Sequence, residues 1–130
     1  MYHPITVPAD ARMLFNIVKL KPEDDIEDVE LTLGEMCEIV KSTYGNKAGG
    51  FIAGQVFKYA GFISDEGSVG PHGSEGEHLA IVTYWKSFEQ HETSHADKTF
   101  LDKFSELSDM CSETKELGYE LLWQGEPENN

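Results

Sequence analysis

Apolar residues recur along the chain at two spacings, those of strands and those of helices. Residues 13–21, 49–63 and 78–85 are rich in β-branched and aromatic residues and predict three strands. The sequence YELLWQG after Gly118 predicts a fourth strand. Residues 24–44 carry a stripe of apolar residues at helical spacing, which predicts a long helix. The stripe consists of Ile26, Val29, Leu33, Met36, Val40 and Tyr44.

Capping signals mark where the helices begin. Asp24 and Glu27 have the spacing of a capping box at the start of the first helix. Ser87 and Gln90 have the same spacing after the third strand, and Asp97 predicts the N-cap of a further helical stretch. The apolar stripe of that stretch is Phe100, Leu101, Phe104, Leu107, Met110 and Cys111.

The element order is therefore β-α-β-β-α-β. This order predicts a ferredoxin-like α+β domain, a four-stranded antiparallel sheet with two helices on one face. We expect a single domain over residues 12–125, an N-terminal lead over residues 1–11 and an acidic tail over residues 126–130.

The second strand is apolar on both of its faces. Alternation in a strand points Phe51, Ala53, Phe57 and Tyr59 one way and Ile52, Val56, Ala60 and Phe62 the other. Two helices shield only one face, so we expect a second copy to cover the other in a homodimer. The space between two facing sheets would suit a small apolar molecule.

Composition argues against several classes of partner. The chain has 24 acidic and 10 basic residues, a net charge of −14 that would repel nucleic acid and anionic membranes. No apolar run approaches the roughly 18 to 20 residues of a membrane span, and the N-terminus lacks the pattern of an export signal. We expect a cytoplasmic protein with no nucleic-acid or membrane partner. Cys37 and Cys111 lack C-x-x-C spacing and are interpreted as free thiols, with a disulfide between them as the alternative.

One long stretch carries a family resemblance. The run AIVTYWKSFEQHETSHADKTFLDKF has a strand that ends in Tyr-Trp, a Ser-capped helix and a second helix after a break. Together with the first strand MLFNIVKLKP and the element order, it resembles the dimeric α/β-barrel proteins of the antibiotic biosynthesis monooxygenase type over about residues 12–124. That family includes cofactor-independent oxygenases acting on aromatic polyketides, haem-degrading monooxygenases and proteins without a known reaction.

The resemblance implies some site residues and argues against others. The haem-degrading branch has an asparagine on its first strand, which aligns with Asn16. Its helical tryptophan falls at Ser94 and its haem-binding histidine at Phe104, which argues against haem degradation. The resemblance to the oxygenases implies a reaction without metal or cofactor, in which the carbanion or enolate of the substrate reacts with oxygen.

The sequence HETSH, residues 91–95, matches the H-E-x-x-H signature of zinc proteases. The extended signature with a glycine and a third histidine is absent, so a third ligand would have to come from Glu106, Glu113 or Glu116. The polar neighbours of the two histidines predict a half-exposed helix rather than a protease cleft. A zinc hydrolase is therefore the less favoured interpretation.

Two other interpretations of HETSH remain. Phe88, His91 and His95 share one helix face, so the imidazoles could simply pack with Phe88 into the core. Alternatively, the two histidines act as a general base, or hold a metal with His72 or His78.

Asn16 is a polar residue on the strand face that also carries Leu14, Val18 and Leu20. It either makes a structural hydrogen bond or fixes a substrate oxygen in the space between the sheets. We predict catalytic roles for Asn16, His91 and His95, in a protein that binds a small apolar or aromatic molecule and oxidises or isomerises it. A non-catalytic binding protein is the alternative. The further ligand-binding candidates are Gln55, Tyr59, Tyr84 and Trp85.

Overall fold

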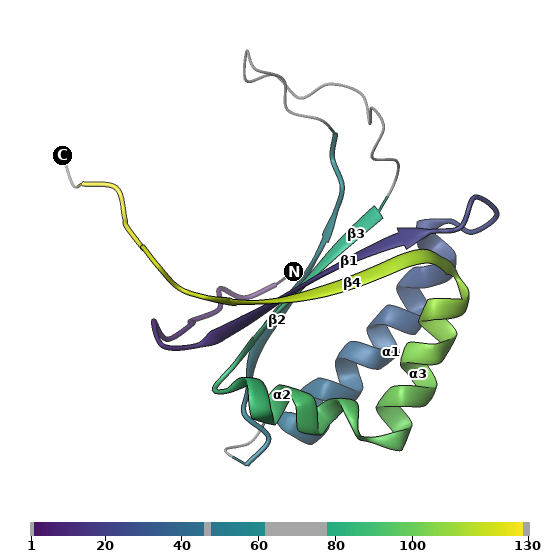
Figure 1. The fold of residues 1–130 in the computed structure, drawn as a ribbon. Coiled ribbons are helices and arrows are strands. Elements are labelled where there is room, and N and C mark those ends of the chain that lie inside the picture. The colour runs from purple at the N-terminus through teal and green to yellow at the C-terminus, as the bar shows by residue number, and fades with distance from the viewer. Residues whose placement is uncertain (1, 46–47, 62–77, 129–130) are drawn as a thin grey trace.

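The computed structural model describes residues 2–45, 48–61 and 78–128. Its strands form one antiparallel sheet in the order β2-β3-β1-β4, and its three helices lie on one face of that sheet (Figure 1). The predicted ferredoxin-like α+β fold is confirmed. The predicted surface loop over residues 64–77 lies outside the described residues. The elements are β1 (Arg12–Leu20), α1 (Ile26–Tyr44), β2 (Phe51–Lys58), β3 (His78–Trp85), α2 (Phe88–His95), α3 (Lys98–Asp109) and β4 (Cys111–Glu120).

Helix α1 begins one residue later than the capping signal predicted. Asp25 is the N-cap: its Oδ1 accepts a hydrogen bond from the Asp28 backbone N–H at 3.0 Å, and the Asp28 carboxylate accepts one from the Asp25 N–H at 3.2 Å. The box of Asp24 and Glu27 was therefore wrong, because the run of acidic residues offers the same spacing in two registers. Among the described helices, none combines the length and the apolar character needed to cross a membrane.

The hydrophobic core lies between the sheet and the helices. Val18 of β1, Val29 of α1 and Leu107 of α3 are completely buried. The residues that α1 contributes to the core, Val29, Leu33, Met36 and Val40, all belong to the predicted apolar stripe. The buried core cluster is Leu14, Val18, Val29, Leu33, Met36, Val40, Leu79, Ile81, Trp85, Phe100, Leu107 and Cys111.

The strand register divides the sheet into a helix face and an open face. Directly paired residues of antiparallel strands point to the same side, so the partners of core residues mark the helix face and the residues between them mark the open face. Helices lie on the first face only (Figure 1), and on the second Phe57 is 50% exposed and Tyr119 44%. The open face carries the apolar side chains of Met13, Phe15, Ile17, Ala53, Phe57, Ala80, Val82, Leu117 and Tyr119.

Strand β2 departs from the simple alternation that its sequence predicted. Its register against β3 shifts between Phe51 and Ala53. The irregularity places Phe51 on the helix face, where its ring packs against Trp85 with centroids 5.4 Å apart, while Ala53 and Phe57 lie on the open face. The grouping of Phe51 with Ala53 and Phe57 was therefore wrong, since an extra residue in a strand reverses the side chains on either side of it.

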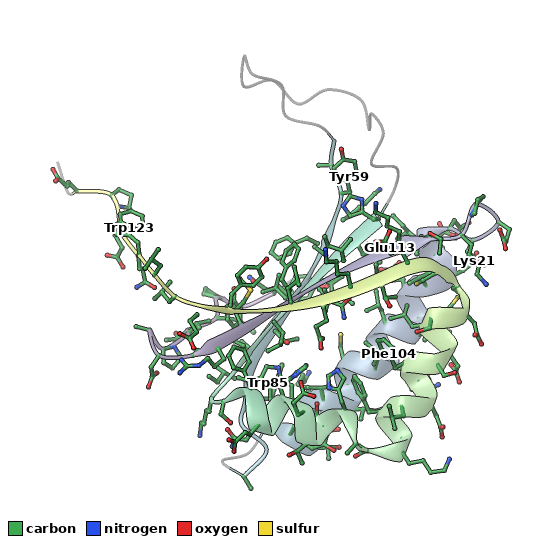
Figure 2. All side chains as sticks on the ribbon, viewed as in Figure 1. Lys21, Tyr59, Trp85, Phe104, Glu113 and Trp123 are labelled. Carbon is green, nitrogen blue, oxygen red and sulfur yellow. The ribbon has the colours of Figure 1, made fainter. Side chains whose placement is uncertain are left out.

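The predicted position of the fourth strand was also wrong. Residues 119–125 were expected to form it, whereas β4 runs from Cys111 to Glu120. This edge strand pairs only with β1, and every residue after Cys111 is exposed, so its sequence lacks apolar alternation. Residues 121–128 have no regular structure and run away from the sheet, with Trp123 far from the helices (Figures 1 and 2).

Both cysteines are free, as predicted. Cys111 is the first residue of β4 and not part of a helix, as the apolar stripe had suggested. Burial raises the pKa of the Cys37 thiol and of the Cys111 thiol, which keeps both in the protonated form that is a poor nucleophile.

Replacement of a core leucine in α3 should destabilise the fold. Leu107 is completely buried, whereas Leu101 on the same helix is 46% exposed. We expect Leu107→Ala to lower the free energy of unfolding by about 2–5 kcal/mol. Leu101→Ala should cost well under half of that, because its side chain already contacts water. Denaturant unfolding at one protein concentration measures both, and equal losses would contradict the assignment of the core.

The contact between Tyr44 and Asp97 should be visible in a pH titration. Tyr44 Oη donates a hydrogen bond to Asp97 Oδ2 at 2.7 Å, at the N-cap of α3. Burial of the phenol, then the hydrogen bond and charge of Asp97, raise the pKa of Tyr44 to about 12. Ultraviolet difference titration of wild type against Tyr44→Phe isolates this phenol. The neutral phenol is favoured by folding, so its stabilising contribution is complete below pH of about 10 and is lost as the pH rises through about 12.

A second variant tests the cause of this shift. Asp97→Asn keeps a capping side chain but removes the charge, so we expect the pKa of Tyr44 to fall while staying above its ordinary value, because burial remains. An unchanged pKa in this variant would exclude the contact.

Candidate functional site

The two imidazoles of HETSH lie on adjacent turns of α2. Ser87 starts this helix, since its Oγ accepts a hydrogen bond from the Gln90 N–H at 3.1 Å, as the capping signal predicted. The helix ends at His95, so both histidines fall within its 8 residues. His91 is only 2% exposed, and its ring packs edge to face against the Trp85 ring, with centroids 5.3 Å apart. The interpretation that the imidazoles continue the buried helix face is therefore confirmed for His91.

Glu116 of β4 reaches the same place from the sheet. Its Oε1 lies 3.4 Å from His91 Nε2 and 3.6 Å from His95 Nε2. Asn16 is its direct partner on β1, and Asn16 Nδ2 donates a hydrogen bond to Glu116 Oε2 at 3.4 Å. We call Asn16, His91, His95 and Glu116 the His–Glu cluster. The side chains of His95 and Glu116 are 29% and 31% exposed, so the cluster can be reached from solvent.

The other ring nitrogen of each histidine also faces an acceptor. His95 Nδ1 lies 3.1 Å from the backbone oxygen of His91, and His91 Nδ1 lies 3.3 Å from Glu92 Oε1. A carbonyl and a carboxylate only accept hydrogen bonds, so we infer that both rings carry a proton on Nδ1. Nε2 of each ring is then the nitrogen that faces Glu116, as an N–H donor when the ring is protonated and as a lone pair when it is neutral.

The electrostatics of the cluster favour an ionised Glu116. Burial raises the pKa of this carboxyl group, but the contact with His91, the charges of both imidazoles and the hydrogen bond from Asn16 outweigh burial. The net pKa lies below the ordinary value for glutamate. The cluster therefore offers an anionic oxygen beside two nitrogen donors.

Asn16 leaves one buried acceptor unused. Its Oδ1 has no hydrogen-bond partner among the residues that the structure describes, although Asn16 is only 8% exposed. Such an atom normally finds a partner, and an exception asks for an explanation. Asn16 also lies on the helix face, so its predicted place in the space between two sheets was wrong.

Six of the seven predicted site residues fall into two groups. Asn16, His91, His95 and Trp85 come together on the helix face. Tyr84 and Gln55 lie on the open face, where Tyr84 Oη donates a hydrogen bond to Gln55 Oε1 at 3.4 Å.

Tyr59 follows the end of β2 and stacks on His78, with ring centroids 4.4 Å apart. Figure 2 shows Tyr59 and Trp85 at opposite ends of the sheet. His78 therefore does not serve as the additional metal ligand suggested from the sequence, and His72 lies outside the described residues.

Glu116 is the residue that sequence reasoning left undecided. It was one of three glutamates considered as a third ligand, on the assumption that a helix would carry it. The strand pattern Thr114, Glu116, Gly118 could have singled it out, since these alternate residues share the helix face. That signal was hidden by the wrong position of the fourth strand.

Two surface hollows lie beside other elements. One, of about 550 Å³, lies between the N-terminal lead and β2 and is lined by residues that include Thr6, Pro8, Phe51 and Lys86. The other, of about 220 Å³, is lined by Tyr44 and Gln90 among others. Neither lining contains a residue of the His–Glu cluster.

Comparison with known proteins identifies the fold but no relative by sequence. No family model and no curated protein matches the chain. Among solved structures, SnoaB, a cofactor-independent oxygenase from Streptomyces nogalater, is 12% identical, with 92% of this chain and 100% of that chain covered at a TM-score of 0.62. A hydroxynitrile lyase from Passiflora edulis is 9% identical, with 92% and 100% covered at a TM-score of 0.63.

A third similar structure is a dimeric protein of unknown function with a ferredoxin-like fold from Bacteroides fragilis. It is 9% identical, with 85% of this chain and 96% of that chain covered at a TM-score of 0.55. The resemblance to dimeric α/β-barrel proteins that the sequence suggested is thus confirmed at the level of the fold. Because an oxygenase and a lyase share this fold, the fold does not specify a reaction.

Proposed function

We propose that this protein is a homodimeric α/β-barrel protein that binds a small apolar or aromatic molecule at the His–Glu cluster. The observation that carries the proposal is the buried, unpartnered Oδ1 of Asn16 beside two imidazoles and a carboxylate. A few convergent polar groups against an apolar wall are typical of small-molecule sites. Trp85 and Phe100 supply that wall, since Trp85 packs on His91 and Phe100 packs on His95 with ring centroids 4.7 Å apart.

The energetics of Asn16 support a ligand with a hydrogen-bond donor. A buried acceptor without a partner costs about 1–3 kcal/mol, which a hydroxyl or N–H of a bound molecule would recover. The partly exposed side chains of His95 and Glu116 give such a molecule access. An apolar or aromatic body would then lie against the rings of the wall.

The oxygenase chemistry inferred from the resemblance stays a prediction. In it, an Nε2 lone pair of the cluster removes a proton from the bound molecule, and the resulting carbanion reacts with oxygen. The fold that the chain shares with SnoaB supports this chemistry, and a binding protein without catalysis would use the same contacts.

The homodimer is supported by the open face of the sheet. Its nine apolar side chains come from all four strands, and no described helix covers them. A contiguous apolar surface of this kind is unusual on a monomer. A two-fold arrangement would cover the same face on both copies, and the dimeric protein from Bacteroides fragilis has a similar fold.

A charge on the open face should separate the two copies. Phe57→Glu would bury a carboxylate in the proposed interface, so we expect monomers by analytical ultracentrifugation, with an unchanged far-ultraviolet circular dichroism spectrum. Leu31→Glu makes the same kind of change on α1, at a residue that is 71% exposed, and should leave the dimer intact. A monomeric wild-type protein would refute the homodimer.

A thermal-shift screen of small aromatic and apolar molecules should find ligands. A molecule at one hundred times its dissociation constant adds about 2.7 kcal/mol of stability. We expect Asn16→Ala and His95→Ala to weaken the response to each hit, whereas Gln124→Ala in the exposed C-terminal segment should not. If both cluster variants respond as wild type does, the ligand binds elsewhere and the proposed site is wrong.

A further inference from the structure

We propose that His91, His95 and Glu116 bind a divalent transition-metal ion, with zinc as the first candidate. The three side chains come from two elements, one turn of α2 and the middle of β4. One ligand atom of each lies within 4.8 Å of the other two. The ion would add a positive charge at the polar end of the site where we propose that the small molecule binds.

The distances suit an ion between the groups better than a direct ion pair. A hydrogen bond from an imidazolium to a carboxylate has a length of about 2.7–2.9 Å. The two nitrogen-to-oxygen distances here are 3.4 and 3.6 Å. Two ligand atoms that each lie about 2.0–2.1 Å from a tetrahedral zinc ion are about 3.4 Å apart, which matches both distances. The third edge, between the ligand nitrogens of the two imidazoles, lies within 4.8 Å here and would be about 3.4 Å around such an ion.

The orientation of the rings points the same way. Nδ1 of each ring faces its own acceptor, so Nε2 is the nitrogen that each ring turns toward Glu116. A metal ion there would take the place of the positive charge that ring protons otherwise supply beside this carboxylate. Metal-binding histidines almost always donate their other N–H to a carboxylate or a backbone carbonyl, and Glu92 and the backbone oxygen of His91 fill those roles.

Glu92 distinguishes this site from a zinc protease. In the H-E-x-x-H signature the glutamate activates the metal-bound water. Here Glu92 Oε1 contacts Nδ1 of His91, on the side of the ring opposite to the ligand nitrogen, and the Glu92 side chain is 74% exposed. Glu92 therefore orients a ligand, and the chemistry at the ion differs from that of the proteases.

The ligand set also indicates the kind of ion and its use. Two imidazoles with one carboxylate suit zinc or iron(II), and hard ions such as magnesium prefer oxygen ligands. Three protein ligands leave at least one coordination position open, as in catalytic and not structural zinc sites. The ion would occupy the Nε2 lone pairs, so the metal-free proton removal predicted from the sequence would not operate in the loaded protein.

Metal binding can be measured without knowing the ligand or the reaction. The full chain, produced without a histidine tag and stripped with a chelator, is titrated with zinc in competition with a chromophoric indicator. Plasma mass spectrometry then counts the bound metal, and the absorption spectrum of the cobalt(II) form reports the coordination geometry. For the wild-type protein we expect one ion per chain and an absorption spectrum of bound cobalt(II).

Matched variants identify the ligands. Glu116→Gln should weaken zinc binding at least 100-fold and abolish the cobalt spectrum. Glu113→Gln makes the same change on the same strand but on the open face, where Glu113 pairs with Lys19 at 3.8 Å, and should bind zinc as wild type does. Glu92→Gln should weaken binding about tenfold, as for partners of metal-binding histidines. Circular dichroism confirms that each variant is folded.

The result that would overturn the proposal is a wild-type chain that binds no ion at one equivalent, or a Glu116→Gln variant that binds as tightly as wild type. Failure here would leave the ligand-binding proposal standing, because the thermal-shift screen can be run with a chelator present. Conversely, a screen without hits would leave the metal stoichiometry unaffected.

Discussion

The pairing of β1 with β4 is the constraint on which the site depends. Its register makes Asn16 and Glu116 direct partners and turns both toward the helices. A shift of one residue would move Glu116 to the open face and bring Lys115 or Leu117 beneath α2 instead. Because β4 is an edge strand with exposed residues, its own apolar content does little to fix the register. Its backbone pairing with β1, the edge-to-face contact of Tyr119 with Phe15 and the cluster itself support this register.

The His–Glu cluster places polar side chains between the sheet and α2, beside the hydrophobic core. His91 and Ser94 of α2 are almost completely buried, and Ser94 Oγ donates a hydrogen bond to the His91 backbone oxygen at 2.6 Å. That oxygen also accepts from His95 Nδ1, so one carbonyl fixes two side chains. Polar groups in a low-dielectric environment are costly unless each has a partner, so the network must be nearly complete to be tolerated. The one buried acceptor of this network that lacks a partner among the described residues, Asn16 Oδ1, is therefore the atom that points to a bound ligand.

Much of the fold could be predicted from local signals. Ser87 and Asp97 cap the helices as expected, and the stripe from Val29 to Val40 is buried as its spacing requires. The errors have physical causes. The acidic run before α1 permits two capping registers, a bulge at Phe51 reverses part of β2, and β4 has too few apolar residues to show strand periodicity.

Only part of the site could be predicted from the sequence, because the position of β4, which carries Glu116, was not recognised. His91 and His95 belong to one short motif, and strand phase correctly grouped Asn16 with Leu14 and Val18, although it did not show that this face lies under the helices. Glu116 is 100 residues from Asn16 along the chain, and nothing short-range joins them. Only the antiparallel return of β4 brings the carboxylate under α2, so the complete cluster is a product of topology.

The two tryptophans of the chain occupy opposite environments. Trp85 is 1% exposed and touches His91, whereas Trp123 is 80% exposed on the segment that runs away from the sheet (Figure 2). The fluorescence emission of the buried Trp85, next to the cluster, should therefore lie at shorter wavelength than that of the exposed Trp123. Each molecule thus carries two intrinsic fluorescent reporters, Trp85 for changes at the imidazoles and Trp123 for contacts made by residues 121–128.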